Sequence, residues 1–245
     1  MCHLRKLLLY IAVVLIVFSS ASAVQAEEVK LHGYKKDGGY QYIYMGAYPQ
    51  REDGQVAHIL WRVLFADDDY ALLLSEFILF NHNVHADFKE YEAFEGQFNL
   101  TDIYRLLNEE FIHTAFSETE QQRLITTEEL GTVFLISGED LKNKDYGFTS
   151  NASRQGFGTP YALANGLFRY SANGRKSSPF WTRSRSTTLA SGVRCTKVDG
   201  SIGYIRCVVE DEGVRPAVML ELNNGKAAFI SGDGSAESPF LVEKK

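Results

Sequence analysis

The sequence predicts a single α+β domain, with helices early in the chain and strands late. Two segments with helical signals lie between residues 101 and 125, and a stretch rich in Gly, Ser and Asn spans residues 151–174. Short apolar runs then follow one another from residue 179 onward. Helices and strands that are segregated along a chain, rather than alternating, are typical of the α+β class. No internal repeat and no long linker divides the sequence.

The first 26 residues have the features of a secretory signal peptide. Arg5 and Lys6 precede an apolar run at residues 7–18, and small residues follow, with cleavage expected after Ala23 or Ala26. A retained N-terminal anchor helix is the alternative. We therefore expect an exported protein that is periplasmic, attached to the cell surface or secreted. Its domain would span residues 27–245, and no later apolar stretch is long enough for a membrane span.

The charge of the chain is negative and unevenly distributed. Without Arg5 and Lys6 it has 23 basic and 31 acidic residues, a net charge of −8. This balance excludes general nucleic-acid binding, which uses basic patches to neutralise phosphates. Residues 27–150 have a net charge of −13 and residues 151–245 a net charge of +5. The two parts are expected to attract each other within one fold; alternatively, the basic part holds an anionic ligand.

Cys195 and Cys207 are the two cysteines that follow the signal peptide. In an exported protein they predict a disulfide around the Asp199-Gly200 hairpin turn. Such a bridge would close a loop of about 13 residues and contribute about 3 kcal/mol. The alternatives are two reduced thiols in the core or a two-thiolate metal site.

Strands are predicted at residues 40–50 and as a pair at 58–79 around an acidic turn. Both faces of the first strand of that pair are mostly apolar, so we expect it to be central in its sheet. Residues 80–99 show no period and are expected to form a long loop. The late strands are expected at residues 179–186, 192–198, 202–209, 213–220 and 226–231.

Two early helices are predicted from spacing and capping residues. Thr101 is a suitable N-cap for the first, whose apolar stripe is formed by Ile103, Leu106, Leu107 and Phe111. Ser117 and Glu120 match a capping box at the start of the second. A further short helix is expected after Thr159, with Pro160 in its first position.

The order of several motifs resembles a known family. The motifs are "YIYMGAYPQ", "ILWRVL", "LLLSEFIL", "LLNEEFIHTAFSETE", "VFLIS", "TPYA", "FWTRS" and "GVRPAVML". Together they resemble a bacterial domain of unknown function (six-two-seven-three) over about residues 40–222, found in exported and cell-surface proteins. The last two motifs are also similar to the end of C-type-lectin-like folds, which include formylglycine-generating domains.

This resemblance implies a C-type-lectin-like domain with a small, mostly antiparallel sheet, long loops, and ligands bound at loops and late strands. Residues 180–185 depart from the family pattern, which has two aromatics before the arginine and a proline after the serine.

The candidate ligand-binding residues are Trp181, Arg183, Arg185, Tyr204 and Arg215. Guanidinium groups match carboxylates and phosphates bidentately, and aromatic rings offer stacking surfaces. The alternative is that the arginines pair with acids of the fold, since an unpaired buried charge is costly. The acids considered are Glu76, Glu210, Asp211 and Glu221.

Signals for metals and catalysis are sparse. His82, His85 and Asp87 have the chemistry of metal ligands, although a solvated loop is the alternative. The triplets of a calcium-dependent sugar site are missing, and so are G-x-S-x-G, P-loop and H-E-x-x-H patterns. The sequence therefore predicts no catalytic residues and no cofactor.

We expect an exported, non-catalytic binding or interaction domain that recognises a glycan, a peptide or another cell-envelope component. One alternative is a sulfatase-modifying-factor-like enzyme on the same fold. The other is a structural surface protein.

Overall fold

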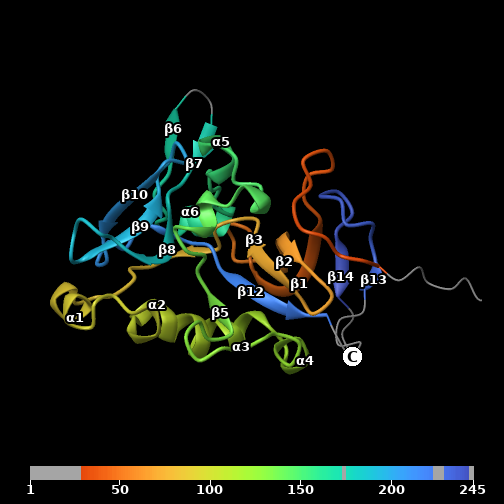
Figure 1. Cartoon of the computed structure of the whole chain (residues 1–245), viewed down its shortest axis with the longest axis horizontal. Coiled ribbons are helices and arrows are strands. Elements are labelled where there is room, and N and C mark those ends of the chain that lie inside the picture. The colour runs from red at the N-terminus through yellow and green to blue at the C-terminus, as the bar shows by residue number, and fades with distance from the viewer. Residues whose placement is uncertain (1–28, 173–174, 223–228, 243–245) are drawn as a thin grey trace, which may run out of the picture.

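The computed structural model describes residues 29–172, 175–222 and 229–242 (Figure 1). It confirms an α+β fold with mostly antiparallel sheets. The prediction of one small sheet is wrong, because the strands form two larger sheets and a two-stranded ribbon. The predicted signal peptide, residues 1–26, lies outside the described residues. None of the described helices is long and apolar enough to cross a membrane.

The larger sheet has seven strands. In order across the sheet they are β13 (Phe229–Ser231), β14 (Phe240–Val242), β1 (Tyr42–Pro49), β2 (Val56–Ala66), β3 (Tyr70–Ser75), β12 (Ala217–Glu221) and β5 (Val133–Phe134). Neighbouring strands are antiparallel except β1 and β14. The central place predicted for β2 is confirmed. Its apolar alternation breaks where the register shifts between Val63 and Phe65, which leaves Leu64 buried and Phe65 half-buried.

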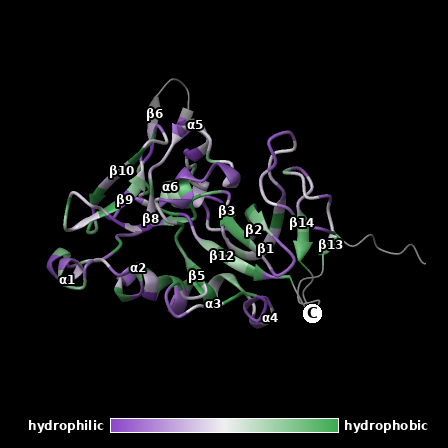
Figure 2. Cartoon of the chain, in the orientation of Figure 1, coloured by the Kyte–Doolittle hydropathy of each residue, from purple (hydrophilic) through white to green (hydrophobic). Residues whose placement is uncertain are grey.

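The second sheet has five strands. Their order is β10 (Ile202–Arg206), β9 (Gly192–Thr196), β8 (Phe180–Arg185), β11 (Gly213–Val214) and β4 (Phe80–Asn81). A ribbon of β6 (Tyr170–Ala172) and β7 (Arg175–Ser177) lies beside it (Figure 1). Figure 2 shows hydrophobic colouring on many strands and hydrophilic colouring on much of the helical layer.

Short helices form a layer along one side of the larger sheet, below β12 and β5 in Figure 1. The predicted first helix is a continuous segment made of α2 (Asp102–Arg105), a π-helical turn η2 (Leu106–Phe111) and α3 (Ile112–Ala115). Thr101 caps it, and Ser117 and Glu120 form the predicted capping box of α4 (Glu118–Gln121).

The remaining helical elements lie in longer connections. They are η1 (Phe98–Leu100), η3 (Asp140–Lys142), η4 (Lys144–Tyr146), α5 (Asn151–Arg154) and α6 (Pro160–Ala164). The start of α6 after Thr159 is as predicted.

The long loop expected at residues 80–99 is partly structured, so that prediction is wrong. It contains β4 and a helix, α1 (Phe88–Ala93). The Asp87 side chain caps α1 by accepting hydrogen bonds from the backbone N–H groups of Lys89 and Glu90. An aspartate followed three residues later by a glutamate is a helix-start signal, although the segment has no apolar period to accompany it.

Two pairs of strands pass from one sheet into the other. β3 continues through residues 76–79 to β4, while β11 continues through Arg215 and Pro216 to β12. The backbone N–H of Leu79 donates to Val214 O (3.1 Å), and that of Ser75 donates to Pro216 O (2.9 Å). Pro216 therefore lies where the chain leaves one sheet for the other, and its missing N–H interrupts neither ladder.

A charge cluster of the buried Arg215 with the partly buried Arg62 and Glu76 holds this crossing. Arg215 is 1% exposed; its Nε donates to Ser75 O (2.7 Å), and its Nη2 lies 3.9 Å from Glu76 Oε2. Arg62 donates twice to the same carboxylate, at 2.8 and 2.7 Å. Burial, and next the charge of Arg62, lower the pKa of Arg215 to about 10. One carboxylate thus serves two guanidinium groups, so Arg215 anchors its strand to an acid, as the alternative reading predicted.

Ion pairs also join the acidic first part of the chain to the basic second part. Arg183 Nη1 lies 3.2 Å from Asp140 Oδ2, and Arg194 Nη1 lies 3.0 Å from Glu139 Oε1. With the pair of Arg215 and Glu76, these contacts agree with the expected attraction between the two parts.

The charge cluster gives the first prediction. Glu76→Gln should lower the free energy of unfolding by about 3 kcal/mol, because the buried Arg215 and the partly buried Arg62 lose their shared counter-charge. Chemical denaturation measured at neutral pH checks this. Glu109→Gln, on an exposed helical position, is the control and should change stability by less than about 0.5 kcal/mol. An unchanged stability of Glu76→Gln would contradict the role given to the cluster.

Candidate binding site

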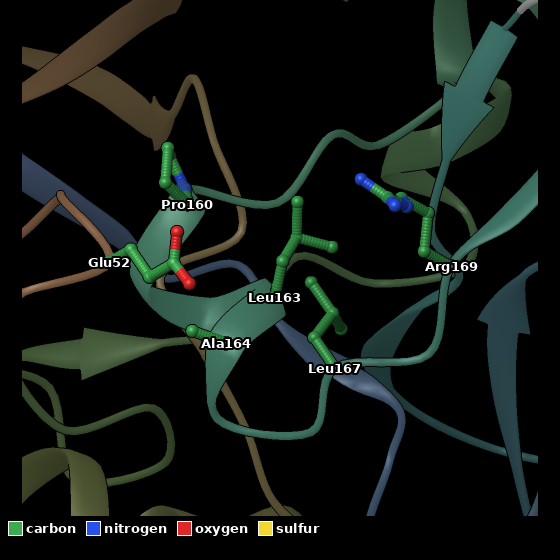
Figure 3. Close-up of a pocket in the computed structure, with 6 residues that line it drawn as sticks. All are labelled: Glu52, Pro160, Leu163, Ala164, Leu167 and Arg169. Atoms are coloured by element: carbon green, nitrogen blue, oxygen red, sulfur yellow. The ribbon is translucent and has the colours of Figure 1, made fainter.

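A cavity of about 580 Å³, here called the α6 cavity, opens beside α6. It is lined by Glu52, Pro160, Leu163, Ala164, Leu167 and Arg169 (Figure 3). Leu167 is buried and Leu163 is half-buried, so the two form an apolar floor. The volume lies in the range of small-molecule pockets.

Backbone hydrogen bonds hold the walls of the α6 cavity. The Thr159 hydroxyl accepts from Ala162 N (3.1 Å) and caps α6. Tyr161 N donates to Gln50 O (3.3 Å), which joins the helix to the β1–β2 hairpin that carries Glu52. On the other side, Phe168 N donates to Asp211 O (2.9 Å) and positions Arg169. At Gly158 the backbone approaches the floor closely: a Cβ at this position would lie 2.3 Å from Leu167 Cδ2, so a larger residue would displace that side chain.

Two opposite charges face each other across this cavity. Figure 3 shows the carboxylate of Glu52 and the guanidinium of Arg169 entering from opposite sides, with Leu163 between them. Within the described residues, neither side chain forms a hydrogen bond or an ion pair. Both residues are exposed, so the charges are solvated and available to a ligand.

A second cavity, of about 310 Å³ and here called the Arg183 cavity, lies between η1, the turn before β5 and β8. It is lined by Gln97, Phe98, Asn99, Glu129, Leu130, Arg183 and Ser184. Of the five ligand-binding candidates from the sequence, Arg183 is the one that lines a described cavity.

The structure does not gather the five candidates into one site. Trp181 is fully buried and its Nε1 donates to His82 O (2.8 Å), so its indole is part of the core and offers no stacking surface. Arg215 is buried in the charge cluster. Arg185 is half-buried, and its Nε has no hydrogen-bond partner among the described residues. Tyr204 is 52% exposed on the edge strand β10 and is not among the residues that line either cavity.

The candidate metal ligands also do not converge. His82 Nδ1 lies 2.7 Å from Asn83 O, Asp87 caps α1, and His85 is buried with Nδ1 3.1 Å from Asp102 Oδ2. Among the residues that the structure describes, no group of three or more His, Cys, Asp or Glu side chains is arranged to hold a metal ion. The three residues thus stabilise the segment that the sequence suggested was a loop.

The predicted disulfide is not formed: Cys195 and Cys207 are free, buried thiols. Strand register explains the outcome, because Cys195 lies opposite Gly203, whereas Cys207 N bonds to Ser191 O. The two cysteines are therefore about 13 Å apart along the hairpin, beyond the reach of a disulfide. Burial raises the pKa of Cys195 to about 12 and that of Cys207 to about 11, so both thiols are poor nucleophiles at neutral pH.

This arrangement predicts that a reductant leaves the melting temperature of a protein comprising residues 27–245 unchanged. After denaturation without reductant, a thiol reagent should label both cysteines, as mass spectrometry can count. A mass lower by two hydrogens, with no labelling, would instead demonstrate a bridge.

Glu212 is a buried acid with an unusual pKa. It is 7% exposed, and its Oε2 has no hydrogen-bond partner among the described residues. Burial, and next the charge of Asp211, raise its pKa from 4.5 to about 8. The folded protein therefore keeps a proton on Glu212 at pH values where the unfolded chain has lost it.

Stability should consequently depend on pH through Glu212. The stabilisation that protonated Glu212 gives to the folded state is complete below about pH 4.5. It disappears as the pH rises to about 8, because the carboxyl group ionises in the unfolded chain first and a buried carboxylate is unfavourable in the fold. Denaturation between about pH 5 and pH 9 should show stability falling in the wild type and falling less in Glu212→Gln. Glu210→Gln, an exposed neighbour, should follow the wild type. Equal pH profiles for wild type and Glu212→Gln would contradict this assignment.

Sequence reasoning missed most cavity residues. Glu52 and Arg169 are separated by more than a hundred residues, and nothing in their local pattern marks them. Gln97, Asn99 and Glu129 lie in segments without period. The exposed Phe168 beside Arg169 is a local signal that could have drawn attention to the α6 cavity.

Comparison with protein families gives a match at residues 68–222, more than half of the chain. The chain belongs to the family described as Domain of unknown function (DUF6273). The match includes α6, β8 and all residues of the Arg183 cavity, whereas β1, β2 and Glu52 precede it. No curated protein matches the chain, and no solved structure matches it either.

Proposed function

We propose that this chain is an exported, non-catalytic binding domain that holds an extended peptide segment in the α6 cavity. The observation that carries the proposal is the pair of unpaired, opposite charges on Glu52 and Arg169, which face each other across an apolar floor (Figure 3). Export rests on the signal-peptide features of residues 1–26. A C-type-lectin-like relationship, implied by "FWTRS" and "GVRPAVML", belongs to the same proposal.

A peptide suits this cavity better than a uniformly charged or purely apolar ligand. An apolar side chain of the peptide would contact Leu163 and Leu167. A basic group would pair with Glu52, and an acidic group with Arg169. Separated charges of opposite sign also fix the direction of the bound segment, since reversed ends would face like charges.

Two sets of fluorescent peptides test the proposal. Each has three apolar residues between a lysine and a glutamate, with the lysine at the N-terminal end in one set and at the C-terminal end in the other. Fluorescence polarisation should show that the wild type prefers one order. Glu52→Gln and Arg169→Gln should each weaken binding of that peptide about threefold, the value of one exposed ion pair.

The double variant Glu52→Arg/Arg169→Glu should prefer the opposite order, while Glu128→Gln, outside the cavity, should match the wild type. The proposal fails if neither set binds, if the preference survives the charge exchange, or if the protein cleaves the peptides.

A further inference from the structure

Three separate segments bring hydrogen-bonding side chains to the Arg183 cavity. Gln97 and Asn99 flank Phe98 at η1, and Glu129 lies at the tip of the turn before β5. Arg183 and Ser184 come from β8. The cavity is separate from the α6 cavity, with which it shares no lining residue.

The surrounding structure fixes this geometry. Thr127 and Gly131 exchange backbone hydrogen bonds of 3.1 and 2.8 Å, which closes the turn that carries Glu129. The Asn108 side chain accepts from the backbone N–H groups of Thr132 and Val133 and so ties the turn to the π-helical segment. A Cβ on Gly131, which has φ 73°, would lie 2.5 Å from Asn108 Oδ1.

Arg183 and Ser184 form hydrogen bonds within the fold, and each also has a donor group that is not bonded in the described part of the chain. Arg183 Nη1 donates to Leu135 O (2.8 Å) and Asp140 Oδ2 (3.2 Å). No partner within the described residues is bonded to its Nε or Nη2. The Ser184 hydroxyl accepts from Gly138 N (2.9 Å), which leaves its own hydrogen free to donate.

The other polar side chains of the cavity have no partners. Gln97, Asn99 and Glu129 are exposed, and within the described parts of the chain their side chains make no hydrogen bond and no ion pair. Two amides, a carboxylate, a hydroxyl and a guanidinium with free donors therefore converge on about 310 Å³.

We propose that the Arg183 cavity is a binding site for a neutral saccharide unit. Each sugar hydroxyl both donates and accepts hydrogen bonds, which matches amides beside a carboxylate and a guanidinium. Leu130 and the largely buried Phe98 also line the cavity and offer a small apolar surface to the C–H groups of a sugar ring. Glu129 and Asp140 oppose an anionic ligand. The volume is at the small end of ligand pockets, so one or two rings fit.

Saturation-transfer NMR with glucose, galactose, mannose and N-acetylglucosamine tests this site. At least one of these sugars should receive saturation from the wild type. Gln97→Ala/Asn99→Ala should weaken its binding about tenfold, because two amide partners are lost from exposed positions that the fold does not use. Ser184→Ala, which removes one hydroxyl, should weaken binding less.

Two controls separate this proposal from the peptide-binding one. Gln122→Ala, an exposed amide outside the cavity, and Glu52→Gln, in the α6 cavity, should bind the sugar as the wild type does. Saturation of none of the four sugars would overturn the proposal. Binding that survives Gln97→Ala/Asn99→Ala, or that is lost in Glu52→Gln, would also overturn it.

Discussion

A buried guanidinium at the point where the chain changes sheets is the constraint on which this fold depends. Arg215 has almost no contact with water, so the Ser75 carbonyl and the Glu76 carboxylate must lie beside it. Ser75 ends β3 and Glu76 follows it, while Arg215 lies between β11 and β12, so their contacts set the position of one sheet relative to the other. Two arginines depend on this one carboxylate, so loss of Glu76 would leave both positive charges uncompensated.

Elements of both cavities are connected to this crossing between the sheets. Thr159, the cap of α6, donates its backbone N–H to Ile78 O (3.0 Å) in the connection that follows Glu76. Arg183 lies on β8, which pairs with β11 immediately before Arg215. Most of the polar side chains of the cavities lie on loops, as in many binding proteins, while Arg183 and Ser184 lie on strand β8. The two sites differ in character, since one is an apolar floor between separated charges and the other is a mixed set of donors and acceptors.

Local signals in the sequence predicted much of the fold. Capping residues located α4 and α6, apolar alternation located β2, and the acidic turn after it located β3. Strand register was not predictable from local signals. The disulfide predicted around the Asp199-Gly200 turn is wrong, because the register places Cys195 and Cys207 apart. Burial was not predictable either. Trp181 has a ring suited to stacking against a ligand, but its side chain is fully buried and donates to His82 O. Candidate site residues depend on which loops meet, and of the predicted set Arg183 alone lines a described cavity.

The strand order has a consequence for the nascent chain. β1, β2 and β3 are synthesised first and can form a three-stranded meander. The two outer strands of this meander pair with strands made much later: β3 with β12, and β1 with β14. Until residues 217–242 have been synthesised, two strand edges and their apolar faces stay open to pairing with other chains. Truncation before β12 would leave this sheet permanently incomplete. During synthesis, the unpaired edges must be kept from other chains until β12 and β14 have been made.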